Sequence, residues 1–274
     1  MMEQYIEKAK TLLEALPYIQ KFSGKTIVIK YGGSSMENET LKRSVATDIV
    51  LLKFVGINPV VVHGGGIEIN EWLKKLNIPS HFVDGQRVTT PEAMDVIEMV
   101  LTGRVNKSLV NLINQSGGKA VGLSGKDANL ILAEPHPNKA LGLVGNVTAI
   151  NADIIKQLLD DGYIPVISTV GVDDRGQVYN INADVVAGEI AIALKAEKLI
   201  ALSNVDGILD KDRQLIKQVT AMQIKAMIDD GIITGGMIPK VQSLLRAIHA
   251  GVSNVHVISG ENEHSILLEL FTNY

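Results

Sequence analysis

From residue 26 onward, short apolar runs alternate with longer stretches in which apolar residues recur every three or four positions. Runs such as TIVIKY (26–31) and VVVH (60–63) are typical of strands that are buried on both faces of a sheet. The longer stretches have the period of helices that cover such a sheet. The pattern predicts strands at 26–31, 60–63, 119–123, 163–168, 198–203 and 254–259, and helices at 41–54, 67–76, 91–115 (in two parts), 152–160, 183–195, 220–229, 238–250 and 263–271.

This alternation predicts an α/β fold, a three-layer αβα sandwich with a mainly parallel central sheet. One interruption is expected at 130–134 and 141–149, where glycines punctuate a hairpin. With 274 residues, the chain is long enough for one large domain or for two lobes that share the sheet. A change of motifs after Val170 predicts an N-lobe over 23–170 and a C-lobe over 171–274.

The N-terminal residues 3–16 lie outside the alternation and predict an amphipathic helix that ends at Pro17. Its apolar face must pack on something, and the pattern leaves two interpretations open. The helix can lie on its own domain, or it can be an exchanged arm that joins subunits. The side chains on that face are Ile6, Ala9, Leu13 and Leu16.

Composition and charge narrow the classes of function. The formal net charge is −4 and 20% of the residues are charged, so nothing indicates binding to nucleic acid or to an anionic membrane surface. The chain has no cysteine, which excludes disulfides, thiolate nucleophiles and cysteine metal sites. Neither a signal peptide nor a membrane-spanning run is expected. These features are typical of a soluble, cytoplasmic protein.

Glycines directly follow two of the predicted strands. Gly32 and Gly33 come after strand 26–31, and Gly64 to Gly66 come after strand 60–63. Because the carboxyl ends of parallel strands meet at one edge of a sheet, both turns can face the same ligand. Backbone N–H groups at a glycine turn and helix start suit an anion. We interpret His63 as a strand-end histidine bonded to the backbone, rather than as a metal ligand or a base.

Three better-known glycine motifs do not fit the chain. An HGGG oxyanion hole requires a G-x-S-x-G nucleophile, and GLSGK (122–126) has the wrong spacing. GKT (24–26) cannot end a Walker A loop, because Ile19 stands where that loop needs its first glycine. No G-x-G-x-x-G follows a strand, which argues against a dinucleotide fold.

Three charged residues lie beside these glycine-rich turns and helix starts. Lys30 ends an apolar strand, where its burial is costly unless it meets a negative charge. Asp184 opens a helix, and Lys240 follows the turn TGGM by about one turn. Each alone could be a snorkelling lysine or an acid favoured by the helix dipole. Together they are the parts of a phosphoryl-transfer site without a Walker loop.

Six motifs resemble, in the same order, those of the amino acid kinase family: KYGGSSM, VVVHGGG, RVTTPEAMDVI, NINAD, SNVDGIL and GGMIPKV. The resemblance runs from about Thr11 to Thr272 and is greatest to the branch that acts on N-acetyl-L-glutamate. It implies ATP-dependent phosphorylation of the γ-carboxylate to N-acetylglutamyl 5-phosphate in arginine biosynthesis, by direct in-line transfer. No general base is needed, because a carboxylate is already ionised at neutral pH.

The resemblance implies a role for each matching residue. Lys30 and Lys240 would flank the transferred phosphoryl group, and Asp184 would hold both lysines in position. Gly32 and Gly33 would donate backbone N–H groups to the ATP phosphates. Mg²⁺ would travel mainly on those phosphates, and no metal site of the protein's own is implied.

The remaining matches concern the acceptor and the nucleoside. Gly65 and Gly66 would cradle the reacting carboxylate, Arg87 would bind the α-carboxylate through its planar fork, and Asn180 would hydrogen-bond N-acetylglutamate. The adenine and ribose would lie near two segments of the C-lobe. These are Asn204, Val205, Asp206, Gly207, Ile208 and Leu209, and Ile232, Ile233, Thr234, Gly235 and Gly236.

The N-terminal segment TLLEALPYIQKFSGKT resembles the extra helix of arginine-inhibited members, which interlaces dimers into a ring-shaped hexamer. Residues 1–22 would then form an oligomerisation helix in a homodimer or homohexamer (a trimer of dimers), with further dimer contacts in the N-lobe. L-arginine would inhibit from a site at Tyr18, Lys211, His256 and Glu269. The chain ends at LELFTNY, whereas family members continue with a short glycine-containing tail that helps to close this site.

Two other functions stay open. The same chemistry could use another acceptor, such as aminoadipate, glutamate or carbamate, and Gln86 stands where the family more often has leucine, beside Arg87. A catalytically idle arginine sensor or scaffold is the other alternative. It is disfavoured because Lys30, Asp184 and Lys240 are all present.

Overall fold

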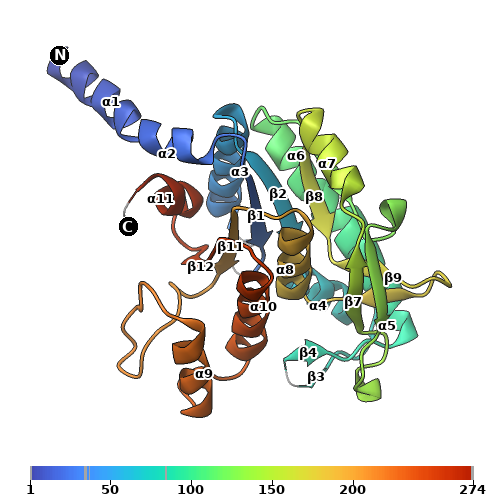
Figure 1. Ribbon diagram of the computed structural model, residues 1–274. Coiled ribbons are helices and arrows are strands. Elements are labelled where there is room, and N and C mark those ends of the chain that lie inside the picture. Colours follow the sequence, from blue (N-terminus) through green and yellow to red (C-terminus); the bar gives the residue numbers. More distant parts are fainter. Residues whose placement is uncertain (1, 34–35, 37, 84, 273–274) are drawn as a thin grey trace.

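A six-stranded parallel sheet forms the centre of the computed structural model, which describes residues 2–33, 36, 38–83 and 85–272 (Figure 1). Every neighbouring pair of strands runs parallel, and helices cover both faces, so the predicted αβα sandwich is confirmed. The strands lie in the order β12 (Asn254–Ser259), β11 (Lys198–Ser203), β1 (Thr26–Tyr31), β2 (Asn58–His63), β8 (Ile164–Ser168) and β5 (Ala120–Leu123).

Alternating side chains of each central strand pack into two separate cores. In β1, Ile27 and Ile29 belong to the core on one face, and Val28 belongs to the core on the other. The first core is covered by α3 (Glu39–Phe54), α4 (Gly66–Lys75), α5 (Pro91–Glu98), α6 (Asn106–Gln115) and α11 (Ser265–Phe271). The second is covered by α7 (Asp153–Asp160), α8 (Ala183–Ala193) and α10 (Met237–His249).

Two smaller sheets lie beside the central one. One has the order β10 (Val178–Asn180), β9 (Val170–Val172), β6 (Ile131–Pro135) and β7 (Gly145–Ile150), and its β6–β7 hairpin was predicted. The other is the short pair β3 (Phe82–Val83) and β4 (Gln86–Arg87). Since β9 also pairs with β6, strands on both sides of residue 170 share one sheet. The division into lobes at that residue stays a prediction.

The helical region predicted over 91–115 contains a third segment between α5 and α6. It is a π-helix at Met99–Val105. A π-helical turn holds about one residue more than an α-helical turn. The spacing of the apolar residues therefore shifts by one position, while they stay on the face toward the core. The sequence pattern alone therefore shows a nearly continuous helix at this place.

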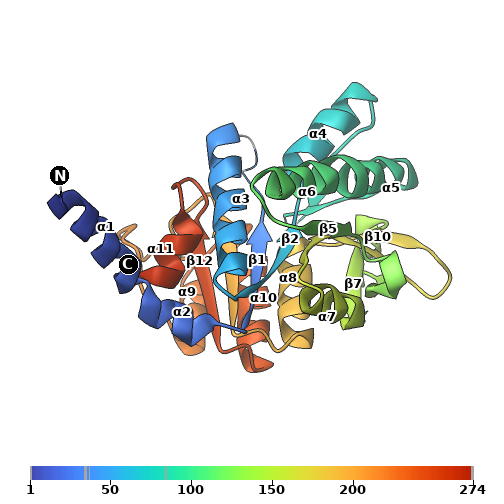
Figure 2. The ribbon, with the colours of Figure 1, turned by 90° about the horizontal axis from the view of Figure 1, so that it is seen from above.

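The N-terminal region forms two helices rather than one. The prediction that the helix ends at Pro17 is wrong in detail, because α1 (Met2–Glu14) is followed by α2 (Leu16–Phe22). Pro17 lies in the first turn of α2, where a missing N–H costs no hydrogen bond. Figures 1 and 2 show α1 extending away from the rest of the molecule, and none of its described residues is buried. It therefore does not lie on its own domain.

A last cluster of apolar residues surrounds α9 (Ala221–Asp229), next to α10. Its buried members are Ile224, Met227, Ile233 and Val241. None of the helices in the described part of the chain combines the length and apolar character needed to cross a membrane.

Candidate active site

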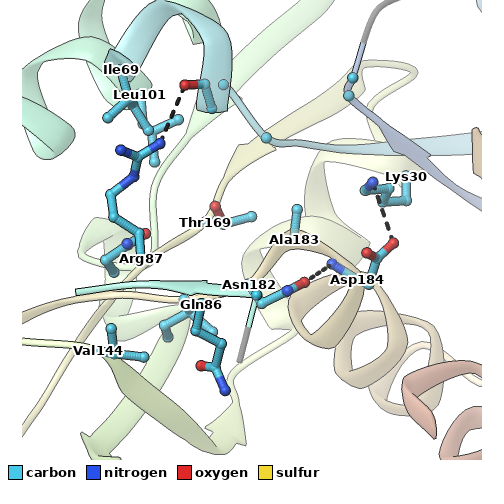
Figure 3. Close-up of a pocket in the computed structure, with 18 of the residues that line it drawn as sticks. Lys30, Ile69, Gln86, Arg87, Leu101, Val144, Thr169, Asn182, Ala183 and Asp184 are labelled. Atoms are coloured by element: carbon cyan, nitrogen blue, oxygen red, sulfur yellow. Dashed lines mark hydrogen bonds and ion pairs between the residues drawn. The ribbon is translucent and has the colours of Figure 1, made fainter. Parts of the chain in front are cut away.

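A cavity of about 260 Å³ lies at the carboxyl ends of β1 and β2, where the two glycine turns meet (Figure 3). This volume suits a small metabolite. Its polar lining comes from the glycine turns, from β4 and from the start of α8, and its apolar lining includes Ile69, Phe82, Leu101 and Val144. The predicted residues on its wall are Lys30, Gly32, Gly33, Gly65, Gly66, Arg87, Asn180 and Asp184.

Backbone contacts hold the two glycine turns together. The N–H of Gly64 donates to the carbonyl oxygen of Tyr31 at 2.9 Å, which joins the ends of β1 and β2. A Cβ atom on Gly65 would lie 2.8 Å from Leu101 and 3.1 Å from Val105, so a larger residue would require these side chains to move. Helix α4 starts at Gly66 with no described side chain at its cap. Its first N–H groups are therefore available to an anion in the cavity.

Asp184 accepts contacts from two lysines that come from distant parts of the chain. Lys30 Nζ lies 3.3 Å from Oδ1 of Asp184, and Lys240 Nζ lies 3.1 Å from Oδ1 and 3.2 Å from Oδ2. All three side chains are largely buried, with 11% or 12% of their surface exposed. Asn182 caps α8 by accepting the Asp184 N–H at 2.8 Å, which places Asp184 in the first turn (Figure 3).

The charges in this group are unequal, which favours an incoming anion. Burial lowers the pKa of Lys30, and the nearby Lys240 lowers it further, against the attraction of Asp184. Burial alone would raise the pKa of Asp184, but Lys30 and Lys240 together hold it below its usual value. With both lysines charged, two cations face one carboxylate, and the surplus positive charge suits phosphate oxygens.

Arg87 enters the cavity from β4, with its guanidinium 4.7 Å from the centre of the Phe82 ring. One nitrogen donates to Ser80 Oγ, and another donates to the carbonyl oxygen of Gly66 at 3.3 Å. Burial lowers the pKa of Arg87. The guanidinium is thereby fixed against the start of α4, where it can present its remaining N–H groups to a carboxylate.

Asn180 is held by a residue that the sequence analysis missed. Its Nδ2 donates to Thr89 Oγ1 at 3.2 Å, and the Thr89 hydroxyl donates to the carbonyl oxygen of Arg87 at 3.0 Å. Thr89 is completely buried. The only signal for it was its place in RVTT, two residues after Arg87. The hydroxyl couples the two proposed acceptor-binding residues to each other.

The two segments predicted to hold the nucleoside lie outside this cavity. Residues 204–209 follow the carboxyl end of β11, and residues 232–236 precede α10. Ile208, Ile232 and Ile233 pack in the cluster around α9, so both segments reach one small core. Gly236 also approaches Gly85, where an added Cβ atom would lie 3.9 Å from the Gly236 Cα. The two predicted binding regions therefore adjoin near the β3–β4 pair.

Of the four residues predicted to bind L-arginine, His256 and Glu269 are in contact with each other. Glu269 Oε1 lies 2.8 Å from Nδ1 of His256 and 2.8 Å from Nζ of Lys198, a lysine that the sequence analysis did not select. Tyr18 packs against the first core, on the side of α11. Lys211 lies in an exposed turn between β11 and α9, with no hydrogen bond or ion pair to the other three in the described structure.

No set of three histidine, aspartate or glutamate side chains in the described residues could hold a metal ion. Asp184, the acidic residue among those that line the cavity, has both carboxylate oxygens in contact with a lysine. Its surroundings fit a carboxylate that positions cations rather than a metal ligand.

Comparison with known proteins gives consistent matches along the chain. The model of the amino acid kinase family matches residues 25–259. A protein from Carboxydothermus hydrogenoformans named acetylglutamate kinase is 54% identical, over 99% of this chain and 97% of that protein. A protein of the same name from Geobacter sp. (strain M21) is 53% identical, over 99% and 97%.

Solved structures have the same fold. The N-acetylglutamate synthase from Neisseria gonorrhoeae, complexed with coenzyme A and N-acetyl-glutamate, matches with a TM-score of 0.86 and 25% identity. The match covers 97% of this chain but 61% of the synthase, so this chain spans about three fifths of it. A carbamate kinase from Giardia has a TM-score of 0.64 at 16% identity, covers 91% and 97%, and shares the fold alone.

Proposed function

The chain belongs to the amino acid kinase family, and on that premise we propose that it transfers the γ-phosphoryl group of ATP to the γ-carboxylate of N-acetyl-L-glutamate. The product is N-acetylglutamyl 5-phosphate, an acyl phosphate of arginine biosynthesis, so the enzyme is a phosphotransferase with a carboxyl acceptor. Relatives named acetylglutamate kinase, more than half identical over nearly the whole chain, support this acceptor.

The contact of Lys30 and Lys240 with one carboxylate, beside a glycine-lined cavity, is the observation that carries the mechanism. An oxygen of the γ-carboxylate attacks the γ-phosphorus of ATP, the bond to the bridging oxygen breaks, and ADP leaves. The two lysines neutralise charge on the transferring phosphoryl group, while Asp184 keeps them in position. Catalysis is by positioning and charge neutralisation, without a covalent enzyme intermediate.

The acceptor is held by residues on the wall of the cavity. Arg87 binds the α-carboxylate through two parallel N–H groups, and Asn180 hydrogen-bonds the acetamido group. Gly65 and Gly66 donate their N–H groups to the reacting carboxylate. The cavity volume and its few apolar side chains support an acceptor of this size.

ATP lies with its phosphates at Gly32 and Gly33 and with its nucleoside along residues 204–209 and 232–236. This placement is supported by the junction of Gly236 with Gly85, which brings the nucleoside segments to the edge of the acceptor cavity. The phosphate oxygens of ATP are hard ligands of the kind that Mg²⁺ prefers, so they would hold the ion, which would neutralise part of their charge.

Regulation and assembly extend the proposal. The helices over residues 2–22 form an arm that joins dimers into a homohexamer, which is supported by the exposed apolar side chains of α1. L-arginine binds beside α11, where Glu269 offers a carboxylate to a guanidinium. His256 and Lys198 already hold this carboxylate, and together these two partners outweigh burial and set its pKa below the usual value.

A coupled ADP-release assay with Mg-ATP tests the proposed function. We expect turnover with N-acetylglutamate and much less with glutamate, aspartate or aminoadipate. Lys30→Ala should lower kcat by about a thousandfold, because it removes a charge that is needed in the transition state. Lys156→Ala, which removes an exposed lysine paired with Asp153, is the matched control and should keep full activity.

Turnover on another acid would support the proposed phosphoryl transfer but would contradict N-acetylglutamate as the acceptor. Full activity of Lys30→Ala would overturn the proposed mechanism. Repeating the assay in millimolar arginine tests the regulatory part, which unchanged activity would contradict.

A further inference from the structure

His63 is fully buried at the end of β2, directly before the glycine turn, and no step of the proposed mechanism uses it. Its Nδ1 lies 2.8 Å from the carbonyl oxygen of Gly64, the next residue. Its Nε2 lies 3.0 Å from Nδ2 of Asn106, the first residue of α6. Both ring nitrogens are thus engaged, one by the glycine turn and one by a helix on the same face of the sheet.

These partners fix the position of the imidazole proton. Lys107 Nζ, which can only donate, lies 3.0 Å from Oδ1 of Asn106, so this oxygen is the acceptor end of the amide. Nδ2 of Asn106 therefore donates, both to the carbonyl oxygen of Val166 at 2.9 Å and to Nε2 of His63. Nε2 must accept, and the proton of the neutral ring is on Nδ1. A carbonyl oxygen such as that of Gly64 accepts only from a protonated nitrogen, so both ends of the ring require the same tautomer.

The hydrogen bond from His63 sets the orientation of the peptide between Gly64 and Gly65. No peptide bond in the described chain is cis, so the N–H of Gly65 points away from the Gly64 carbonyl group. The carbonyl faces the buried imidazole, so the N–H of Gly65 faces away from it, and Gly64, Gly65 and Gly66 all line the cavity. The N–H of Gly64 is itself bonded to Tyr31, which holds the other end of the same residue.

The π-helix packs against the same glycine turn. Leu101 and Val105 crowd the position that a Cβ atom on Gly65 would take, and Asn106 directly follows the π-helix. Burial lowers the pKa of His63 to about 4, and the charge of Lys107 acts in the same direction, so the ring stays neutral near pH 7. The glycine turn is therefore in contact with both a neutral imidazole and two apolar side chains.

We propose that His63 is a positioning residue for phosphoryl transfer. Asn106 imposes the Nδ1–H tautomer, and this tautomer holds the Gly64–Gly65 peptide so that the Gly65 N–H donates to the reacting carboxylate. The inference rests on the proposed function for the identity of that carboxylate. Its structural part, the tautomer and the peptide orientation, is independent of it.

The first test is nitrogen-15 NMR of histidine-labelled protein near pH 7, on the unsubstituted chain. The inference requires a protonated Nδ1 and an unprotonated Nε2 for His63, the reverse of the tautomer that free neutral histidine prefers. A protonated Nε2 would overturn the inference whether or not the enzyme is active. Transfer failing on every acceptor would instead count against the proposed function.

The second test compares His63→Asn with His63→Gln. The asparagine amide can occupy the place of Nδ1 and donate to Gly64, whereas the glutamine amide occupies the place of Nε2. Both variants lose one ring contact, so they are matched in the packing that they disturb. We expect His63→Gln to lower kcat by about a hundredfold, as the loss of one fixed donor does, with an unchanged KM for ATP. His63→Asn should recover most of this loss.

Equal kcat values for the two variants, or an unchanged kcat in His63→Gln, would overturn the inference. Thermal unfolding of both variants separates positioning from stability, because a purely structural role predicts that kcat follows the fraction folded. If His63→Gln does not fold, His63→Asn alone decides the test. A folded His63→Asn whose kcat is lowered by about a hundredfold would also overturn the inference.

Discussion

Thr89 touches no proposed substrate atom, yet its hydroxyl joins Asn180 to the carbonyl group of Arg87. Thr89→Val keeps the side-chain shape and removes the hydroxyl, which leaves the Asn180 amide without its partner. We expect KM for N-acetylglutamate to rise about tenfold, the value of roughly one hydrogen bond, with an unchanged KM for ATP. Steady-state kinetics with each substrate varied in turn measures both constants.

The control for this substitution is Thr148→Val, on an exposed position of β7. It should leave both constants unchanged. A similar rise in the two KM values of Thr89→Val would mean that the hydroxyl supports the fold as a whole rather than the acceptor.

The charged residues that line the cavity were predictable from the sequence, whereas the buried neutral residues Thr89 and Asn106 were not. Lys30 and Asp184 stand out because an ionised group in an apolar context requires a partner, and the structure does bring them within 3.3 Å. Their catalytic roles stay predictions. Thr89 and Asn106 are common polar residues whose value comes only from contacts made by distant segments, such as the contact of Asn106 with His63. No local pattern reveals such a contact.

Helix α1 has exposed apolar side chains and no buried residue in its described length. Leu13 is 65% exposed, on the face that the sequence pattern predicts to be apolar. Placing a charge on this face with Leu13→Glu should prevent its burial between subunits. We expect the mass measured by analytical ultracentrifugation to fall from a hexamer to a dimer that stays folded, because Leu13 supports no core of its own chain.

Lys8→Glu changes the charge at an exposed position on the same helix and serves as the control. It should keep the mass of the unsubstituted protein. An unchanged mass of Leu13→Glu would contradict the proposal that α1 joins the subunits.

Long elements were predicted well, and the shortest ones were missed. The six central strands and the covering helices have enough residues for a period to show. Strand β9 has three residues and the β3–β4 pair has two residues in each strand, so their pairing is set by tertiary contacts. The π-helix was missed because its extra residue preserves an apolar face toward the core.

The stability of the whole molecule depends on a buried carboxyl group that joins α3 to α11. Asp48 is fully buried, and its Oδ1 lies 2.6 Å from Nδ1 of His264, while Oδ2 has no hydrogen-bond partner in the described structure. Burial raises the pKa of Asp48 to about 6, against the opposing effects of His264 and of the backbone N–H groups of Leu267 and Ile266.

The folded chain therefore holds this proton more tightly than the unfolded chain, in which the pKa is near 3.8. The stabilisation is complete below about pH 4 and is lost as the pH rises through about 6. Asp48→Asn is neutral at every pH, so its free energy of unfolding relative to the unsubstituted protein should increase by up to about 3 kcal/mol between pH 4 and pH 7. Urea unfolding at both pH values measures the difference.

The contributions of Asp184 and Glu269 to stability depend on pH in the opposite direction. Their pKa values are lowered in the folded chain, so these contributions are lost as the pH falls. The comparison of two chains at each pH cancels these shared contributions. Asp174→Asn, at an exposed position, is the control and should show no pH-dependent difference. A constant difference for Asp48→Asn would show that folding does not raise the pKa of Asp48.

The order of the central sheet has a consequence for how such an enzyme can diversify. Strand β1 separates β11, which leads to the proposed nucleoside segment 204–209, from β2 and β8, which lead toward the acceptor cavity. Substitutions on the two sides share few neighbours, so their effects should be nearly additive. A related enzyme could then evolve specificity for a new acceptor while its ATP-binding residues stay the same. Lys30 is the exception, because it stands on the dividing strand and serves both sides, so it has the least freedom to drift.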